Sequence, residues 1–507
     1  MKQLPHDKYD GYRGIGIRLN EPLLSDVAYE NVEDDTPFIK TYHAFDKSHV
    51  LMLGENNIIP QKDAQSILKE LRYMDKKGVE EIRSQHGWGL HSGEHYLIRK
   101  LGYDVGGRIH LARSSGDLGQ VRVHVFLRDQ ILQTIPLMIQ VEKTLIEFAI
   151  KHRKVIVPES THGLHAQVTT LGAYALMWAE GLHRDIDRFC YSYKYSNSSP
   201  AGSAIGTGSP FPVNRKRTAE LLGFDDVRES TLDAILGTDD SLLQVYSNLA
   251  ILCSHTGRWA DDLAFFYSDD MLLIDLPDRF CHTSSIMMHK KNPVALEHMR
   301  SSTATAIGSL TGAFSASKSK TGPAESGMST IWPISLQNIF NLARRDLTWL
   351  TTMLPDITIR EQYVELKSKS RWATATEIAA TIVKEKGYSW RIAHQCVGTL
   401  VRLAEERNIN SQDTTSELLD EAAIEYFGKP IGLTKNQYEN ALNPLNSVLS
   451  RQVEGGPHPE HTLSIAKNLT NSLTDQEKWL EEKLQLLKDS EIKLNKEIDN
   501  FILKGES

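Results

Sequence analysis

The sequence has few cysteines, no excess of positive charge and no long apolar run, and each absence excludes a class of protein. Its 507 residues include four cysteines, which lie far apart and form no CxxC pair. This pattern predicts a reducing compartment and no disulfide framework. The formal net charge is −8, from 57 basic and 65 acidic residues, which argues against a nucleic-acid-binding protein. No run approaches the roughly 18 apolar residues of a membrane span, and the first residues lack the apolar core of a signal peptide, so we expect a cytoplasmic protein.

Helical periodicity is what the sequence has in abundance. The clearest stripe lies between residues 232 and 266, where apolar side chains recur every three or four positions. This stripe is several times longer than an average helix. Residues 121–152 and 166–192 carry similar patterns. The sequence therefore predicts a long helical bundle. Because so much apolar helix surface is seldom left to solvent, we expect bundles from several subunits to pack together.

A chain of this length is too long for one compact core, so two or three domains are expected. We predict an N-terminal domain over residues 1–112, a central helical bundle over 113–365 and a C-terminal helical domain over 366–507. In the last of these, Ser389 is expected to cap a helix. The charged, amphipathic tail over 474–502 is more typical of a helix packed on its own domain than of a partner-binding coiled coil. Strict strand alternation is rare, and residues 271–280 are the best strand candidate.

The stretch CHTSSIMMHKKNP, residues 281–293, gathers reactive side chains just ahead of a helical segment. Asn292 suits a helix N-cap and Pro293 the first helical position. Free N–H groups and the helix dipole at such a point favour an anion, so a carboxylate or phosphate could dock there. The groups beside it are two hydroxyls and two amines: Ser284, Ser285, Lys290 and Lys291. A surface loop before an ordinary helix explains the same residues, although three consecutive large apolar residues are unusual in one.

Two further stretches carry candidate ligands. In residues 106–120, the planar guanidinium of Arg113 suits a carboxylate. In residues 158–167, expected to start a helix, His162 could act as a general acid or base. A surface loop explains the first stretch equally well, and one histidine among 19 is more often structural.

A zinc enzyme is an alternative from another class. His91, Glu94 and His95 fit H-x-x-E-H, the inverted zinc-peptidase pattern, in which two histidines on one helix face bind the metal. So short a pattern arises by chance in a histidine-rich chain, and Gly93 inside it weakens the helix. We therefore predict no metal ligands.

Taken in order, six stretches resemble those of the fumarase/aspartase superfamily and, within it, of argininosuccinate lyase. Residues 283–293 are similar to the signature loop G-S-S-x-M-P-x-K-x-N-P. The other resemblances are HLARSSGDLGQ to HTARSRNDQ, STHGLHAQ to THLQPAQP, SPFPVNR to T-x-FPIDR, RWATATEIAATIVKEKGYSW to the start of the C-terminal domain, and GGPHPE to GGTAPE. The likeness covers nearly the whole chain.

The resemblance implies a mainly α, three-domain fold whose long bundle assembles a homotetramer, with each active site formed where three subunits meet. It also implies a reaction, the reversible elimination of an amine from an N-succinyl compound to release fumarate, without a cofactor. Ser284 then matches the base on a mobile loop, and His162 the group that transfers a proton at the leaving nitrogen. Lys290 is expected to hold the developing charge. The expected substrate-binding residues are Arg113, Ser114, Ser115, Thr161, Gln167, Asn292 and Ser285.

Departures from the family pattern concern the substrate. Ser115 and Gly116 replace an arginine and an asparagine that contact the substrate, and the LQEDK stretch of argininosuccinate lyase has no counterpart. In the signature loop, Thr283, Met288 and His289 replace glycine, proline and glutamine. We therefore predict that the elimination is retained and that the amine differs from arginine. The alternatives are a true argininosuccinate lyase, a non-catalytic relative like the lens crystallins, and a C–O lyase releasing fumarate.

Overall fold

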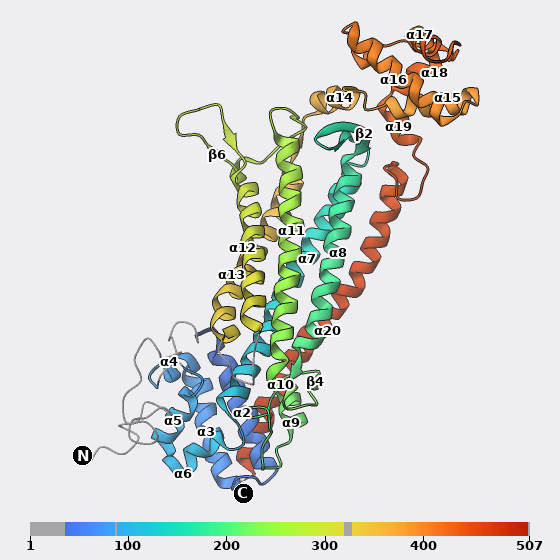
Figure 1. Ribbon diagram of the computed structural model, residues 1–507. Coiled ribbons are helices and arrows are strands. Elements are labelled where there is room, and N and C mark those ends of the chain that lie inside the picture. Colours follow the sequence, from blue (N-terminus) through green and yellow to red (C-terminus); the bar gives the residue numbers. More distant parts are fainter. Residues whose placement is uncertain (1–35, 87–88, 319–326, 505–507) are drawn as a thin grey trace.

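The computed structural model describes residues 36–86, 89–318 and 327–504, and a long helical bundle dominates it (Figure 1). Neighbouring helices of the bundle pack along their lengths. Their facing sides bury one continuous core, in which Trp178, Tyr246 and Phe340 are almost fully enclosed. The mainly α fold is confirmed. The long helices are α7 (Ser115–Lys151), α8 (Leu171–Ser196), α11 (Thr238–Tyr267), α12 (Val294–Ser317), α13 (Gly327–Met353) and α20 (Pro459–Leu503).

Short helices cover the end of the bundle drawn at the bottom of Figure 1. They have a hydrophobic core of their own, to which Leu68, Leu71 and Leu97 belong. The elements there are η3 (Thr36–Phe38), α2 (Ile39–Glu55), α3 (Gln61–Lys77), α4 (Val79–Ser84), α5 (Ser92–Leu101), α6 (Tyr103–Gly106), η4 (Gly107–His110), α9 (Arg215–Leu221) and α10 (Asp233–Leu236).

A second group of helices lies beyond the opposite end (Figure 1). Its core is separate from that of the bundle and includes Ile378, Leu400 and Tyr438. Ser389 caps α16 as predicted, because its side chain accepts a hydrogen bond from the backbone N–H of Ile392. The elements are α14 (Glu361–Lys369), α15 (Ala375–Lys386), α16 (Trp390–Glu406), η7 (Ser411–Asp413), α17 (Ser416–Phe427), α18 (Lys435–Leu442) and α19 (Pro444–Leu449).

Helix α20 contradicts the expectation that the charged tail packs on the C-terminal helices. It runs back along α7 and α8 and reaches α2 and α3 (Figure 1). Leu473 and Leu480 join the core of the bundle, while Leu494 and Ile498 join the core of the N-terminal helices. The amphipathic pattern was therefore interpreted correctly as a helix, but its apolar side is buried against two other regions of the chain.

The strands of the described residues are short and occur in pairs. β1 (Ile156–Thr161) and β2 (Leu164–Thr170) form an antiparallel hairpin, and β3 (Ser198–Ser199) pairs in parallel with β4 (Asp226–Val227). β5 (Ile274–Asp275) pairs antiparallel with β8 (Thr358–Ile359), so the strand expected over 271–280 is confined to two residues. Turns η5 (Asp278–Phe280) and η6 (Leu354–Asp356) flank this pair. Among the described helices, none is both long and apolar enough to cross a membrane.

The packing of α20 gives a prediction about stability. Ile498 is fully buried, whereas Ile492 on the same helix is 56% exposed. Ile498→Ala should lower the free energy of unfolding by about 2–5 kcal/mol, because it leaves a cavity among the N-terminal helices. Ile492→Ala, the matched control, should change it by less than about 0.5 kcal/mol. Urea denaturation measures both, and equal losses would contradict the observed packing.

Candidate active site

The stretch from Cys281 to Pro293 forms a hairpin at the upper end of the bundle (Figure 1). β6 (His282–Thr283) pairs antiparallel with β7 (Lys291–Asn292), and the residues between them form the connecting loop. The prediction that Asn292 caps the following helix is wrong. Asn292 is taken up by the strand pairing, and α12 begins at Val294 without a side-chain cap.

Ser284 differs from its neighbours in being half-buried, whereas the next residues of the loop are exposed. Its Oγ accepts hydrogen bonds from the backbone N–H groups of Ile286, at 3.3 Å, and of Met287, at 3.0 Å. Two N–H dipoles directed at one oxygen favour negative charge on that oxygen. The local fold therefore suits a serine that must lose its proton to act as a base.

The two lysines of the loop have different surroundings. Lys291 Nζ forms ion pairs with Asp275 at 3.2 Å and Asp278 at 2.8 Å, and it also donates to the carbonyl of Leu276. Burial opposes its charge, but the bonds to Asp278 and Asp275 raise the pKa of Lys291 above its usual value. Lys291 thus anchors the base of the hairpin to the segment around β5, while Lys290 is exposed.

A cavity of about 670 Å³ lies beside this hairpin. Tyr267 forms part of its wall and donates a hydrogen bond from its hydroxyl to the carbonyl of Lys291 at 2.7 Å. Its polar lining includes His289, Lys290, Lys291, Asn292, Glu297 and Arg360. The cavity is large enough for a small dicarboxylate, and Lys290 and Asn292 would supply cationic and amide donors to it.

His162 lies at the tip of the β1–β2 hairpin and not at a helix start, so that expectation is wrong. His162 and Gly163 make the turn, with φ values of 55° and 76°. These left-handed conformations at both central residues are the ones that a two-residue hairpin turn of type I′ requires. Thr161 and His162 are exposed, and the side-chain oxygen of Gln167 accepts a hydrogen bond from Arg451 at 3.3 Å.

Arg113 lies at the other end of the bundle and is committed to an ion pair. Its Nη2 is 2.8 Å from the carboxylate of Asp46, which also pairs with Arg83. Burial opposes the charge of Asp46, but the two guanidinium groups hold its pKa below the usual range. All three side chains are almost fully buried. Arg113 therefore fixes α2 against the start of α7 through Nη2, while its buried Nε and Nη1 have no hydrogen-bond partner among the described residues.

Ser114 and Ser115 begin α7 in different ways. Ser114 is the N-cap: its Oγ accepts from the N–H of Gly116 at 2.9 Å, and Asp117 accepts from the N–H of Ser114 at 2.8 Å. Burial raises the pKa of Asp117 to about 6, although its backbone hydrogen bonds oppose this rise. The side chain of Ser115 instead points to His91, with 2.8 Å between Oγ and Nε2.

Within one chain, the predicted site residues lie in groups that are far apart in space. Arg113, Ser114 and Ser115 lie at the start of α7, while Thr161, His162 and Gln167 follow its end. Helix α7 has 37 residues and at 1.5 Å per residue is about 55 Å long. Figure 1 shows the two ends of α7 at opposite ends of the bundle, with the Ser284 hairpin at the upper end. A small substrate cannot reach both groups of one chain.

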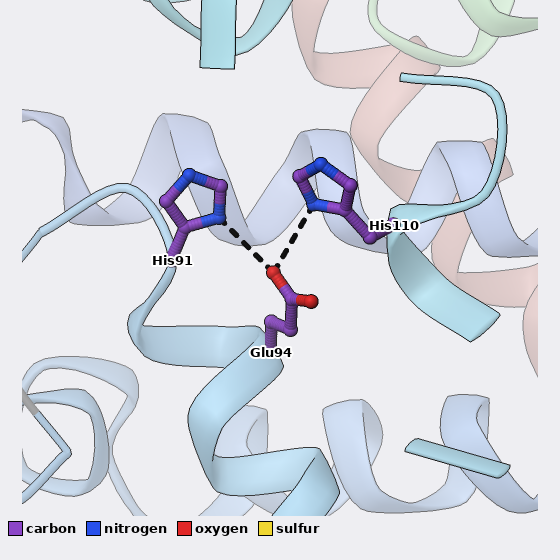
Figure 2. A group of neighbouring side chains, drawn as sticks. All are labelled: His91, Glu94 and His110. Atoms are coloured by element: carbon purple, nitrogen blue, oxygen red, sulfur yellow. Dashed lines mark hydrogen bonds and ion pairs between the residues drawn. The ribbon is translucent and has the colours of Figure 1, made fainter. Parts of the chain in front are cut away.

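A cluster that the sequence analysis did not assemble lies beside Ser115. Figure 2 shows His91 and His110 pointing to one oxygen of Glu94, with Nδ1–Oε2 distances of 3.0 and 3.1 Å. Burial opposes ionisation of Glu94, but the bonds from His110 and His91 hold its pKa well below the usual range. His110 comes from η4 and opens the HLARSSGDLGQ stretch, but nothing in the sequence indicated that it lies beside His91 and Glu94.

The zinc-peptidase alternative is not supported by this arrangement. That pattern needs His91 and His95 as two ligands of one ion, but the potential ligand atoms that converge belong to His91, Glu94 and His110. His95 bonds through Nδ1 to the carbonyl of His86 at 3.2 Å. Hydrogen bonds to Glu94 account for the convergence of the two imidazoles.

Comparison with known protein families and proteins identifies lyases. A family model described as "Lyase" matches residues 38–308, and a model described as "Argininosuccinate lyase C-terminal" matches residues 372–449. The chain is 32% identical over 486 residues to argininosuccinate lyase of Methanocaldococcus jannaschii, covering 95% of this chain and 99% of that one. It is 33% identical to argininosuccinate lyase of Methanosarcina acetivorans, covering 85% and 86%.

Solved structures agree with the family models. EDDS lyase, in complex with formate, superposes with a TM-score of 0.85 at 26% identity, covering 94% of this chain and 93% of that one. The same values hold for a variant of EDDS lyase with bound fumarate. Class II fumarase from Schistosoma mansoni shares the fold, with a TM-score of 0.66 at 16% identity over 85% of this chain and 94% of that one.

The ion pair at the start of α7 gives a second prediction. Asp46→Asn should lower the free energy of unfolding by about 3–5 kcal/mol, because it leaves two buried guanidinium groups without their carboxylate. Glu365→Gln is the control, since Glu365 pairs with Lys369 on an exposed helix surface. Its urea midpoint should not shift measurably. A stable Asp46→Asn protein would mean that the pair does not hold α2 to α7.

Proposed function

We propose that this chain, which belongs to the fumarase/aspartase superfamily and is a carbon–nitrogen lyase, releases fumarate by removing an amine other than arginine from an N-substituted aspartate. The observation that carries the proposal is the β6–β7 hairpin. It holds Ser284 Oγ against two N–H donors, beside a cavity lined by Lys290 and Asn292.

The reaction needs a base, a charge-stabilising site and a proton donor. Ser284 would remove the proton from the carbon next to a carboxylate, with its alkoxide stabilised by the N–H groups of Ile286 and Met287. Lys290 and Asn292 would hold the charge that develops on the carboxylate. His162 would protonate the departing nitrogen. Each step is a proton transfer or a C–N cleavage, so no cofactor is needed.

The start of α7 supports an amine other than arginine. The family's arginine and asparagine are replaced by Ser115 and Gly116, and Gly116 is closely packed. A Cβ at Gly116 would lie 2.5 Å from Cδ1 of Ile205, so a larger residue would require the Ile205 side chain to shift. The segment that lacks the LQEDK motif lies partly outside the described residues, at 319–326. Argininosuccinate lyase itself is the second candidate, because the relatives quoted above carry that name.

The active site would be assembled from several chains in a homotetramer. The length of α7 supports this, since Ser115 and His162 can serve one substrate only if they come from different copies. Large apolar side chains left exposed on the bundle also support it: Met177, Phe265, Ile307, Phe314 and Ile334. The partners are then copies of the same chain and a small-molecule substrate. The four cysteines, all unpaired, support a cytoplasmic location.

Fumarate release tests the proposed reaction. Argininosuccinate and a panel of N-substituted aspartates would be supplied, and fumarate followed by its ultraviolet absorbance. A substituted aspartate should yield fumarate where argininosuccinate does not, and Ser284→Ala should lower kcat at least about 100-fold by removing the base. Ser66→Ala is the control, because the Ser66 hydroxyl bonds only within α3, to the carbonyl of Lys62. Efficient turnover of argininosuccinate would favour the second candidate, and unchanged activity of Ser284→Ala would exclude the assigned base.

The assembly can be tested together with activity. In analytical ultracentrifugation, wild-type protein should have a molecular mass four times the 57.1 kDa of one chain. Ile307→Glu, which places a charge on an exposed apolar position of α12, should give smaller species and lower fumarate release at least about 10-fold. Ile424→Glu is the control, because Ile424 is equally exposed but lies on α17, away from the bundle. An active monomer would contradict the shared site.

A further inference from the structure

Two histidines and a glutamate beside the start of α7 present three atoms that can bind a metal ion. The atoms are Nδ1 of His91, Oε2 of Glu94 and Nδ1 of His110, and Figure 2 shows both rings directed at the same carboxylate oxygen. All three atoms lie within 4.8 Å of one another. Among the described residues, this is the one cluster of histidine, cysteine or acidic side chains that brings three such atoms so close.

The spacing of these atoms is close to the spacing of ligand atoms around a bound zinc ion. Zinc bonds of about 2.0–2.1 Å in a tetrahedron place neighbouring ligand atoms about 3.3–3.4 Å apart. The two Nδ1–Oε2 distances are 3.0 and 3.1 Å. Movements of about 0.3 Å would therefore create the site. The two hydrogen bonds do not prevent this, because an ion that binds all three atoms replaces the hydrogens that the bonds share.

The three ligands are held by elements that pack on one core. His91 is the N-cap residue of α5, Glu94 lies in the first turn of that helix, and His110 ends η4. Leu97 of α5 and Ile109 of η4 are buried in the same hydrophobic core. Apolar packing thus brings the two elements together without an ion. Binding then costs little ordering of the chain, because the ligands are already close.

His91 also has the outer partner that is typical of a metal-binding histidine. A ring that binds an ion through one nitrogen usually donates the hydrogen on its other nitrogen to an oxygen. His91 Nε2 lies 2.8 Å from Ser115 Oγ. With an ion on Nδ1, the ring hydrogen lies on Nε2 and Ser115 accepts it. The hydroxyl therefore orients the ring for binding.

The ligand set favours Zn²⁺ over Mg²⁺ and Ca²⁺. Two imidazole nitrogens and one carboxylate oxygen suit zinc, whereas magnesium and calcium prefer oxygen ligands. The side chain of His91 is 3% exposed, but those of Glu94 and His110 are 18% and 34% exposed. An ion can therefore enter from the side of His110 and keep a water molecule as its fourth ligand.

We propose that His91, Glu94 and His110 bind one Zn²⁺ ion, which joins η4 to α5 just ahead of α7. The inference does not rest on the proposed lyase function, and the ion takes no part in the elimination. It revises the expectation of no metal ligands, and the site still differs from the H-x-x-E-H pattern because His110 replaces His95. A bound ion stabilises the folded chain, since the unfolded chain does not hold the three ligands together.

Titration of the full chain with Zn²⁺ tests the site. Protein freed of metal by dialysis against EDTA should bind one ion per chain in isothermal titration calorimetry, with a Kd of about 1 μM or lower. Saturating Zn²⁺ should raise Tm, because the ion binds only the folded chain. Co²⁺ should give the visible absorption of a tetrahedral complex, and Mg²⁺ should neither bind nor raise Tm.

Variants separate this site from the other histidines of the chain. His110→Ala removes a half-exposed ligand and should weaken Zn²⁺ binding at least about 100-fold, with the fold retained in circular dichroism. Glu94→Gln keeps the size of the side chain but removes its charge, and should weaken binding similarly. His95→Gln is the matched control, because His95 bonds to the carbonyl of His86. Its Kd should stay within about twofold of wild type.

Three results would overturn the inference. Wild-type protein that gives no binding isotherm with Zn²⁺ would exclude the site. An unchanged Kd in a folded His110→Ala protein would place the ion on other side chains. Equal losses in His110→Ala and His95→Gln would show that the three atoms assigned here are not the ligand set. The fumarate assay bears on none of these, so the proposed function stands or fails separately.

Discussion

The length of α7 is the constraint on which the candidate site depends. A helix of 37 residues holds its two ends about 55 Å apart, and candidate site residues lie at both. The first turn carries Ser114 and Ser115, while the β1–β2 hairpin beyond the last turn carries His162. Neighbouring helices enclose α7 along most of its length, so it cannot bend to bring these groups together. Antiparallel copies of the bundle, placed side by side, would align the start of one α7 with the end of another.

In the β6–β7 hairpin, Lys291 anchors the loop and the adjacent Lys290 does not. Lys291 is tied to Asp275 and Asp278, and its carbonyl is held by Tyr267. Lys290, one residue earlier, faces the cavity without sharing that anchoring role. A loop fixed at its base can move at its tip while its base keeps the cavity in shape. This division explains why two consecutive lysines are not interchangeable in the proposed reaction.

The sequence was sufficient for the helical architecture because long periodic stripes are decided by local spacing. The bundle and the capped start of α16 follow from such signals. Asn292 was misassigned because its N-cap propensity is local, whereas its pairing with His282 is tertiary. His162 was expected at a helix start for a similar reason, because the alternation in β1 and β2 is too short to indicate strands. The turn at Gly163 also lacks the asparagine or aspartate that usually precedes glycine in such a turn.

Clusters formed by residues distant in sequence could not be predicted at all. His110 reaches Glu94 from another element, and Asp46 joins Arg83 and Arg113 from three separate segments. No spacing rule connects such positions, since their proximity is a result of folding. The resemblance to a family supplied the candidate residues at the start of α7, but only the folded structure brings Ser115 to His91. The assignments of Ser284, Lys290 and His162 to catalysis stay predictions.

The path of α20 has a consequence for the order in which the protein folds during synthesis. Hydrogen bonds join Lys47 to Asn495 and Gln65 to the carbonyl of Phe501, across more than four hundred residues of sequence. The helices near the start of the chain therefore emerge from the ribosome long before the segment that completes their core. Contacts so far apart in sequence form slowly, because a long loop must close first. Until then, the apolar surface that receives Leu494 and Ile498 is open to contact with other chains, which is the condition under which incompletely folded proteins aggregate.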